Sequence, residues 1–210
     1  MNRILADEVI ELQTAKYIEN YQLPSPELLN YYRDEDNRHI WIDYEIDNQL
    51  LEAVKLIAFW NKQDKGKPIE ERKKIKIFVF SYGGAIDACF AFLDICAVSE
   101  TPIVTINMGI ALSAGLLILL AGHERYCLPM SQALIHSGSG GTGGTYEQTE
   151  AQMHNYRTLV GMMKDYILSR TKIDPKLFAK KRSSEWYLFS KQQIELGVVD
   201  GLATPDILFE

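Results

Sequence analysis

Two residues of the chain have the types and spacing of a nucleophile and its base. Ser113 lies among small residues, in the stretch Met-Gly-Ile-Ala-Leu-Ser-Ala-Gly at 108–115, and His136 follows 23 positions later (136 − 113) at the end of a short apolar stretch. A serine hydroxyl is a weak nucleophile until a neighbouring imidazole takes its proton. Free backbone N–H groups also gather where a helix begins. The pattern therefore predicts a serine hydrolase, which we interpret as a peptidase.

The elements that must position this pair alternate between strand and helix along the chain. The patterns predict strands at 39–46, 75–80, 103–107, 124–128 and 132–136, and helices at 48–61, 86–98 and 112–121. Such alternation implies parallel strands joined by right-handed crossovers. The glycine-bearing turns at 83–84 and 109 follow strands, and open α/β sheets place their sites at the carboxyl ends of strands.

Two further features follow His136. Residues 137–145 are rich in glycine, and residues 146–170 show an apolar stripe at helical spacing that suggests a partner-facing helix. Asp174 and Pro175 are typical of an N-cap and a first helical position.

The pattern of the amino-terminal residues predicts an extension that precedes the main domain. The pattern predicts a helix over 4–19, a break at 23–26 and a polar loop at 33–37. We therefore expect an extension, residues 1–37, that is helical in part, and one domain over 38–210.

Composition excludes several classes of function. The chain has 210 residues, 47% hydrophobic and 24% charged, which suits one substantial domain. Its net charge of −6 argues against nucleic-acid binding, and its short basic runs at 71–74 and 180–182 suit solvated surface. The longest apolar run, 116–121, is far below the ~20 residues of a membrane span.

The cysteines and the remaining serines suggest no other chemistry. The three cysteines show no metal-ligand spacing, so we expect buried thiols in a reducing, cytoplasmic setting; they are Cys89, Cys96 and Cys127. Ser81, Ser137 and Ser139 lie in turns and glycine-rich stretches, where hydroxyls satisfy local backbone.

With these residues in place, the chain resembles the Clp-type proteolytic subunit (ClpP) family over roughly residues 38–203. The resemblance rests on the order and spacing of five motifs, at 80–84, 108–115, 127–129, 134–136 and 195–200. It implies an α/β fold of the crotonase-like kind, a repeated ββα spiral with a protruding strand-helix handle.

The resemblance also assigns roles to residues. It implies that Ser113 is the nucleophile and His136 the base, and counting back from the motif at 195–200 places the third triad member at Glu185, where the family has aspartate. A glutamate can orient the imidazole if the backbone absorbs its extra methylene. Trp186 and Tyr187 beside it would shield the pair from water, and Asp174 is the rival acid.

By the same resemblance, the backbone N–H groups of Gly83 and Ala114 form the oxyanion hole. Gly83 follows Tyr82, where the family usually has proline. Taken alone, the glycine pair at 83–84 would suit an ordinary strand-to-helix turn.

Partners follow from the resemblance too. Family members hydrolyse protein and peptide substrates without a metal or cofactor, and they stack two heptameric rings into a chamber fed by a separate AAA+ unfoldase. The segment 137–170 corresponds to the part that joins ring to ring. Relatives have axial pore loops at the amino terminus, so the helix expected there leaves the partner open, and a self-contained peptidase is an alternative.

The sequence is also compatible with three other functions. The first is a relative of the signal-peptide peptidases with a Ser-Lys dyad, against which His136 argues. The second is a non-catalytic ring subunit, in which Glu185 or Tyr82 marks a decayed site. The third is a crotonase-like acyl-CoA enzyme, which would need no Ser-His pair.

Overall fold

The computed structural model describes residues 25–181 and 184–209. The chain forms two compact units, residues 1–36 and 37–210. The helix expected over 4–19 lies outside the described residues. The polar loop expected at 33–37 is wrong, because helix α2 spans Pro26–Asn37. Its charged residues extend the helix as a last turn, and the chain leaves the helical conformation only at Arg38, whose φ is 56°.

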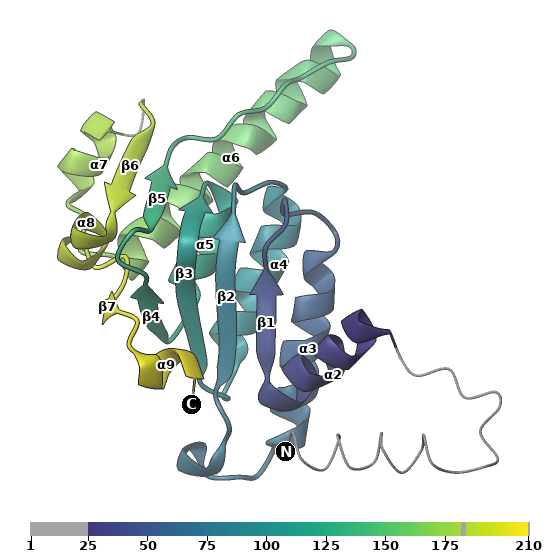
Figure 1. Cartoon of the computed structure of the whole chain (residues 1–210). Coiled ribbons are helices and arrows are strands. Elements are labelled where there is room, and N and C mark those ends of the chain that lie inside the picture. Colours follow the sequence, from purple (N-terminus) through teal and green to yellow (C-terminus); the bar gives the residue numbers. More distant parts are fainter. Residues whose placement is uncertain (1–24, 182–183, 210) are drawn as a thin grey trace, which may run out of the picture. The chain divides into compact units, whose positions relative to one another are not determined.

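The second unit is built on a mostly parallel sheet (Figure 1). Its strands are β1 (His39–Ile42), β2 (Ile75–Ser81), β3 (Ile103–Leu112), β4 (Glu124–Cys127), β5 (Gln132–Ile135), β6 (Trp186–Phe189) and β7 (Gly201–Leu202). The order is β1-β2-β3-β4-β7, while β5 pairs with β3 and with β6. All pairs are parallel except β5–β6. The expected α/β fold with parallel strands is therefore confirmed.

Strand β3 changes its neighbour halfway along. Its first half, from Val104 to Asn107, pairs with β4, and its second half, from Ile110 to Leu112, pairs with β5. The pairing of β3 with β2 is irregular at the same point, and Gly109 N donates to Asn107 Oδ1 there. Because of this switch, the end of β3 lies beside β5 and not beside β4.

Helices cover one face of the sheet. They are α3 (Leu50–Gln63), α4 (Ile86–Val98) and α5 (Ala114–Leu120), and Figure 1 shows them behind the strands. Every residue of α5 is buried, so the apolar run that follows Ser113 forms the centre of the core. On the opposite face, α9 (Pro205–Phe209) packs against a smaller cluster formed by Phe78, Val104 and Ile106.

The handle and the carboxyl-terminal helices complete the unit. Helix α6 (Tyr146–Arg170) begins with a capping box at Thr145 and Gln148, and Figure 1 shows it projecting past the strands. The segment before it, residues 136–145, forms neither strand nor helix, and α6 holds it through Gln152, which bonds both backbone groups of Gly143. Helices α7 (Pro175–Lys181) and α8 (Ser190–Glu195) flank β6, and a single turn, η1 (Ile69–Glu71), precedes β2.

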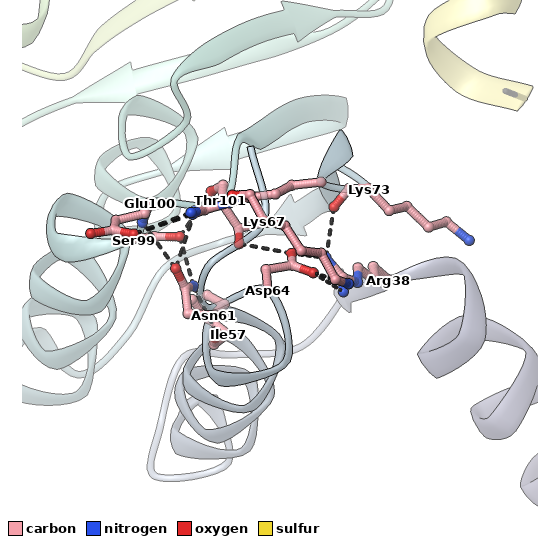
Figure 2. Close-up of polar contacts among 10 residues, drawn as sticks. Arg38, Ile57, Asn61, Asp64, Lys67, Lys73, Ser99, Glu100 and Thr101 are labelled. Atoms are coloured by element: carbon pink, nitrogen blue, oxygen red, sulfur yellow. Dashed lines mark hydrogen bonds and ion pairs between the residues drawn. The ribbon is translucent and has the colours of Figure 1, made fainter. Parts of the chain in front are cut away.

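A buried ion pair ties the start of β1 to the end of α3 (Figure 2). Arg38 donates to both carboxylate oxygens of Asp64, at 2.5 and 2.9 Å, and also to Lys73 O. Thr101 and Lys67 donate to the same carboxylate, at 3.0 and 2.9 Å. The side chain of Asp64 is fully buried, and its hydrogen bonds from Arg38 hold its pKa well below the usual range.

A second buried network fixes the strands that flank the site. The Gln193 amide, which is fully buried, donates to Ser131 O and Leu188 O and accepts from the Asn107 amide. Asn107 also donates to Gln132 O. The network therefore links β3, β5, β6 and α8. In the part of the chain described here, no helix is both long and apolar enough to span a bilayer.

Candidate active site

The pairing of β3 with β5 brings Ser113 and His136 together. Leu112, the last residue of β3, is the register partner of Leu134, and Ser113 N donates to Leu134 O at 3.2 Å. Ser113 is one residue past that point on one strand and His136 two residues past it on the other. Ser113 Oγ and His136 Nε2 lie 2.7 Å apart, which is hydrogen-bond distance for proton transfer.

The backbone at Ser113 is strained in the manner of a nucleophile between a strand and a helix. Its φ of 57° and ψ of −122° lie outside the regions that residues with a side chain normally occupy. Gly83, with a φ of 102°, allows this turn: a Cβ there would lie 2.7 Å from Ser113 Cβ. The sharp turn exposes Oγ at the amino end of α5, and Ser113 is half-buried.

The two N–H groups expected to form the oxyanion hole differ in their hydrogen bonding. Ala114 is the first residue of α5, so its N–H has no partner within the helix. Gly83 N–H, in contrast, donates to Ser81 Oγ at 3.1 Å, and that hydroxyl donates to Tyr44 O at 2.7 Å. The N–H of Gly83 is therefore engaged. The next residue, Gly84, is exposed and lines the same cleft as Ser113.

Ser81 satisfies local backbone, as expected for a serine in a turn, because its hydroxyl accepts from Gly83 N–H. It is fully buried at the end of β2 and joins the glycine turn to the segment that follows β1. Its position two residues before Gly83 was the available signal, because serine hydroxyls often bond backbone groups two residues away.

The expected acid lies next to His136 in the strand pairing but is not bonded to it. The antiparallel ladder ends at the pair Ile135 and Trp186, and His136 and Glu185 are the residues that directly adjoin this last pair. The Glu185 carboxylate accepts a hydrogen bond from the Tyr187 hydroxyl at 3.0 Å. Over the described ranges, no hydrogen bond or ion pair joins Glu185 to His136.

The rival acid is engaged elsewhere. Asp174 Oδ1 accepts from the N–H groups of Lys176 and Leu177, at 2.9 and 3.0 Å. The expected N-cap at the start of α7 is thereby confirmed. This carboxylate is committed to its own helix, so Glu185 is the better candidate for the acid.

A cleft of about 640 Å³ surrounds the serine. One wall is apolar and is formed by Leu159, Val160 and Met163 of α6, and Glu45 and Tyr82 lie at its rim. No lysine lines this cleft among the described residues, and Lys164 faces a small separate cavity beside His136. The cleft can take an extended chain with an apolar side chain against α6.

The cysteines and the other ionisable groups suggest no rival site. Cys89 lies beneath α5, with Sγ 3.6 Å from Ala114 O, and burial raises its pKa to about 12. A thiol with so high a pKa carries almost no thiolate at neutral pH. In the ranges the structure covers, no group of three or more His, Cys, Asp or Glu side chains is placed to hold a metal ion.

Comparison with known proteins agrees with this fold. The family model described as Clp protease matches residues 29–206. The ATP-dependent Clp protease proteolytic subunit 2 of Treponema pallidum (strain Nichols) is 28% identical over 169 residues, which cover 80% of this chain and 82% of that protein.

Two other relatives extend the match. The ATP-dependent Clp protease proteolytic subunit 1 of Bacillus cereus (strain ATCC 10987 / NRS 248) is 30% identical, over 82% of this chain and 88% of its own length. The ATP-dependent Clp protease proteolytic subunit of Leuconostoc citreum (strain KM20) is 26% identical, over 93% of this chain and 94% of its own length. The chain belongs to the Clp protease family.

Proposed function

We propose that the chain is a serine endopeptidase in which Ser113 attacks the scissile carbonyl. The observation that carries this proposal is the 2.7 Å contact between Ser113 Oγ and His136 Nε2, made where a strained turn exposes the hydroxyl. His136 takes the hydroxyl proton as the serine attacks and returns it to the leaving amine. Water then hydrolyses the acyl-enzyme by the same route.

The oxyanion of the tetrahedral intermediate is held by backbone donors. Ala114 N–H supplies one, at the amino end of α5. Because Gly83 N–H is bonded to Ser81, we assign the second donor to Gly84 N–H. Gly83 contributes by letting the turn approach Ser113 closely. Peptide hydrolysis by this route needs no metal or cofactor.

Glu185 completes the triad in this proposal. A carboxylate that accepts from His136 Nδ1 fixes the tautomer whose Nε2 can take the serine proton. The strand pairing supports the assignment, since Glu185 follows the register opposite His136. Its present bond to Tyr187 means that the side chain must turn toward the imidazole for catalysis.

The assembly is part of the same proposal. The named relatives are proteolytic subunits of ATP-dependent proteases. We propose that this chain forms homo-oligomeric heptameric rings, stacked in pairs, that enclose the cleft and receive protein or peptide substrates from an AAA+ unfoldase in the cytoplasm. The projecting helix α6 supports a contact between rings.

Covalent labelling tests the mechanism directly. A fluorophosphonate probe reacts only with an activated serine, so wild-type protein should gain one adduct, located at Ser113 by peptide mass spectrometry. Ser113→Ala should abolish labelling and fluorogenic-peptide cleavage, and His136→Ala should slow both by at least about a hundredfold. Ser169→Ala, an exposed serine of α6, is the matched control and should behave as wild type. Cleavage at the wild-type rate by Ser113→Ala would contradict the mechanism.

A second candidate function is a non-catalytic ring subunit. It is favoured by one observation, the bond of Glu185 to Tyr187 instead of His136. Under this alternative the folded wild-type protein assembles into rings but takes up no probe at Ser113.

A further inference from the structure

Tyr187 is bonded to the candidate acid and is not accounted for by the proposed mechanism. It lies in β6, its side chain is 41% exposed, and its hydroxyl donates to Glu185 Oε2 at 3.0 Å. Residues i and i+2 of a strand face the same side of the sheet. Glu185 directly precedes β6, and its bond to Tyr187 places the two side chains on the same side.

His136 lies on that same face. Tyr187 is the register partner of Leu134 in the antiparallel ladder, and residues directly opposite one another share a face. The ladder ends at Ile135 and Trp186, and His136 and Glu185 are the next residues on the two chain segments beyond this last pair. The carboxylate thus has two donors within reach on one face, the imidazole across the ladder and the phenol two residues along its own strand.

The length of the glutamate side chain allows the Glu185 carboxylate to reach the Tyr187 hydroxyl. A glutamate side chain is one carbon–carbon bond, about 1.5 Å, longer than an aspartate side chain. In this structure the carboxylate extends along β6 to the hydroxyl of Tyr187. His136 already faces Ser113 through Nε2, so its other ring nitrogen, Nδ1, is the one that a triad acid would bond.

We propose that Tyr187 is a positioning residue whose hydroxyl competes with His136 Nδ1 for the Glu185 carboxylate. This inference rests on the proposed function. While the phenol holds Glu185, the imidazole lacks the acceptor that fixes its tautomer, and the site is incomplete. Exchange of the Tyr187 bond for the His136 bond completes the triad and returns the phenol to water, without a covalent change. The observed rate is then the rate of the complete site multiplied by the fraction of molecules that hold it.

Removing the phenol hydroxyl tests this competition. In Tyr187→Phe the carboxylate has lost its alternative donor, so the fraction of complete sites rises. We expect the rate of fluorophosphonate labelling at Ser113, and kcat/KM for a fluorogenic peptide, to increase about two- to tenfold, the effect of one exposed hydrogen bond. Tyr146→Phe removes the hydroxyl of a more exposed tyrosine at the start of α6 and should leave both rates unchanged.

The pH profile provides a readout that a change in packing alone would not produce. A carboxylate that moves next to the imidazole favours the imidazolium, so the acid limb of the kcat/KM profile should shift to higher pH in Tyr187→Phe. Among the described residues, the other charged groups that line these two cavities are Lys164, beside His136, and Glu45, in the cleft. Both are unchanged in the variant.

A double-mutant cycle separates this inference from the proposed function. In a Glu185→Ala background, Tyr187→Phe should have no effect on labelling, because no carboxylate is left to compete for. A rate for Tyr187→Phe that equals or falls below wild type, or a gain that persists without Glu185, would overturn the competition. Neither result affects the mechanism at Ser113, whose test is the loss of labelling in Ser113→Ala.

Discussion

The buried carboxylate of Asp64 should make a large and pH-dependent contribution to stability. Each of its oxygens accepts two hydrogen bonds (Figure 2): Oδ1 from Arg38 and Lys67, and Oδ2 from Arg38 and Thr101. The substitution Asp64→Asn keeps the shape of the side chain but replaces one oxygen with an NH₂ group. At the Oδ1 position the NH₂ would face the donors of Arg38 and Lys67, and at the Oδ2 position it would face an Arg38 donor beside the Thr101 hydroxyl, which can turn and accept. The NH₂ therefore faces at least one Arg38 donor whichever way the amide turns.

The magnitude follows from what the substitution leaves behind. The Arg38 side chain is only 9% exposed, so its guanidinium would remain buried without a counter-charge. Breaking a buried ion pair in this way costs about 3–5 kcal/mol. We expect the free energy of unfolding of Asp64→Asn at pH 7 to fall by that amount, measured by urea denaturation. The labelling rate of the folded protein should not change, because none of these residues lines the cleft.

The pH dependence has a definite sign. The pKa of Asp64 is lower in the folded protein than in the unfolded chain, so its contribution is fully present above the unfolded value, about 4, and is lost as pH falls toward the folded value. The difference in stability between wild type and Asp64→Asn should therefore be constant from about pH 5 to pH 8 and shrink below about pH 4.

A double variant supplies the control. Arg38→Met combined with Asp64→Leu removes both charges and fills the space, and such replacements are often neutral or stabilising. It should be more stable than Asp64→Asn at pH 7. If Asp64→Asn loses less than about 1 kcal/mol, or its deficit does not shrink in acid, the buried pair does not stabilise the fold as argued.

Two other predictions concern the site and the core. Gly83→Ala should abolish labelling of Ser113, because the new Cβ would lie 2.7 Å from Ser113 Cβ and 2.8 Å from Leu112 O. The control Gly141→Ala, whose Cβ would have nothing within 4 Å, should be labelled like wild type. Normal labelling of both variants would show that the turn tolerates a side chain. The native protein should resist iodoacetamide at pH 8 and react with it after denaturation, because burial raises the pKa of all three thiols, those of Cys89, Cys96 and Cys127. Rapid modification of the native protein would contradict the burial of these cysteines.

The amino-terminal extension shows where local reading failed. The charges at 33–36 suggested a loop, yet they form the last turns of α2. A run of charged residues is compatible with either state, and the helix ends only where Arg38 takes a positive φ. That conformation is followed at once by the buried bonds of Arg38 to Asp64, a residue 26 positions away. The residues around Arg38 in the sequence do not show that its side chain will bond Asp64.

The sequence by itself identified the candidate site residues and determined the class of fold. Ser113 and His136 could be identified because a hydroxyl among small residues and an imidazole at a strand end are local patterns, and the alternating apolar runs predicted parallel strands. The order of the family motifs then pointed to Glu185 as the candidate acid. Each of these inferences uses only residue types and short spacings.

The tertiary structure alone decided which groups meet. Strand β3 pairs with β4 up to Asn107 and with β5 from Ile110 onward. This non-local pairing brings Ser113 Oγ to 2.7 Å from His136 Nε2. The tertiary structure also brings the Gly83 N–H to the Ser81 hydroxyl and the Tyr187 hydroxyl to the Glu185 carboxylate, and each pair forms a hydrogen bond. A donor or acceptor chooses among the partners that folding brings within about 3 Å, and a linear pattern does not contain those distances.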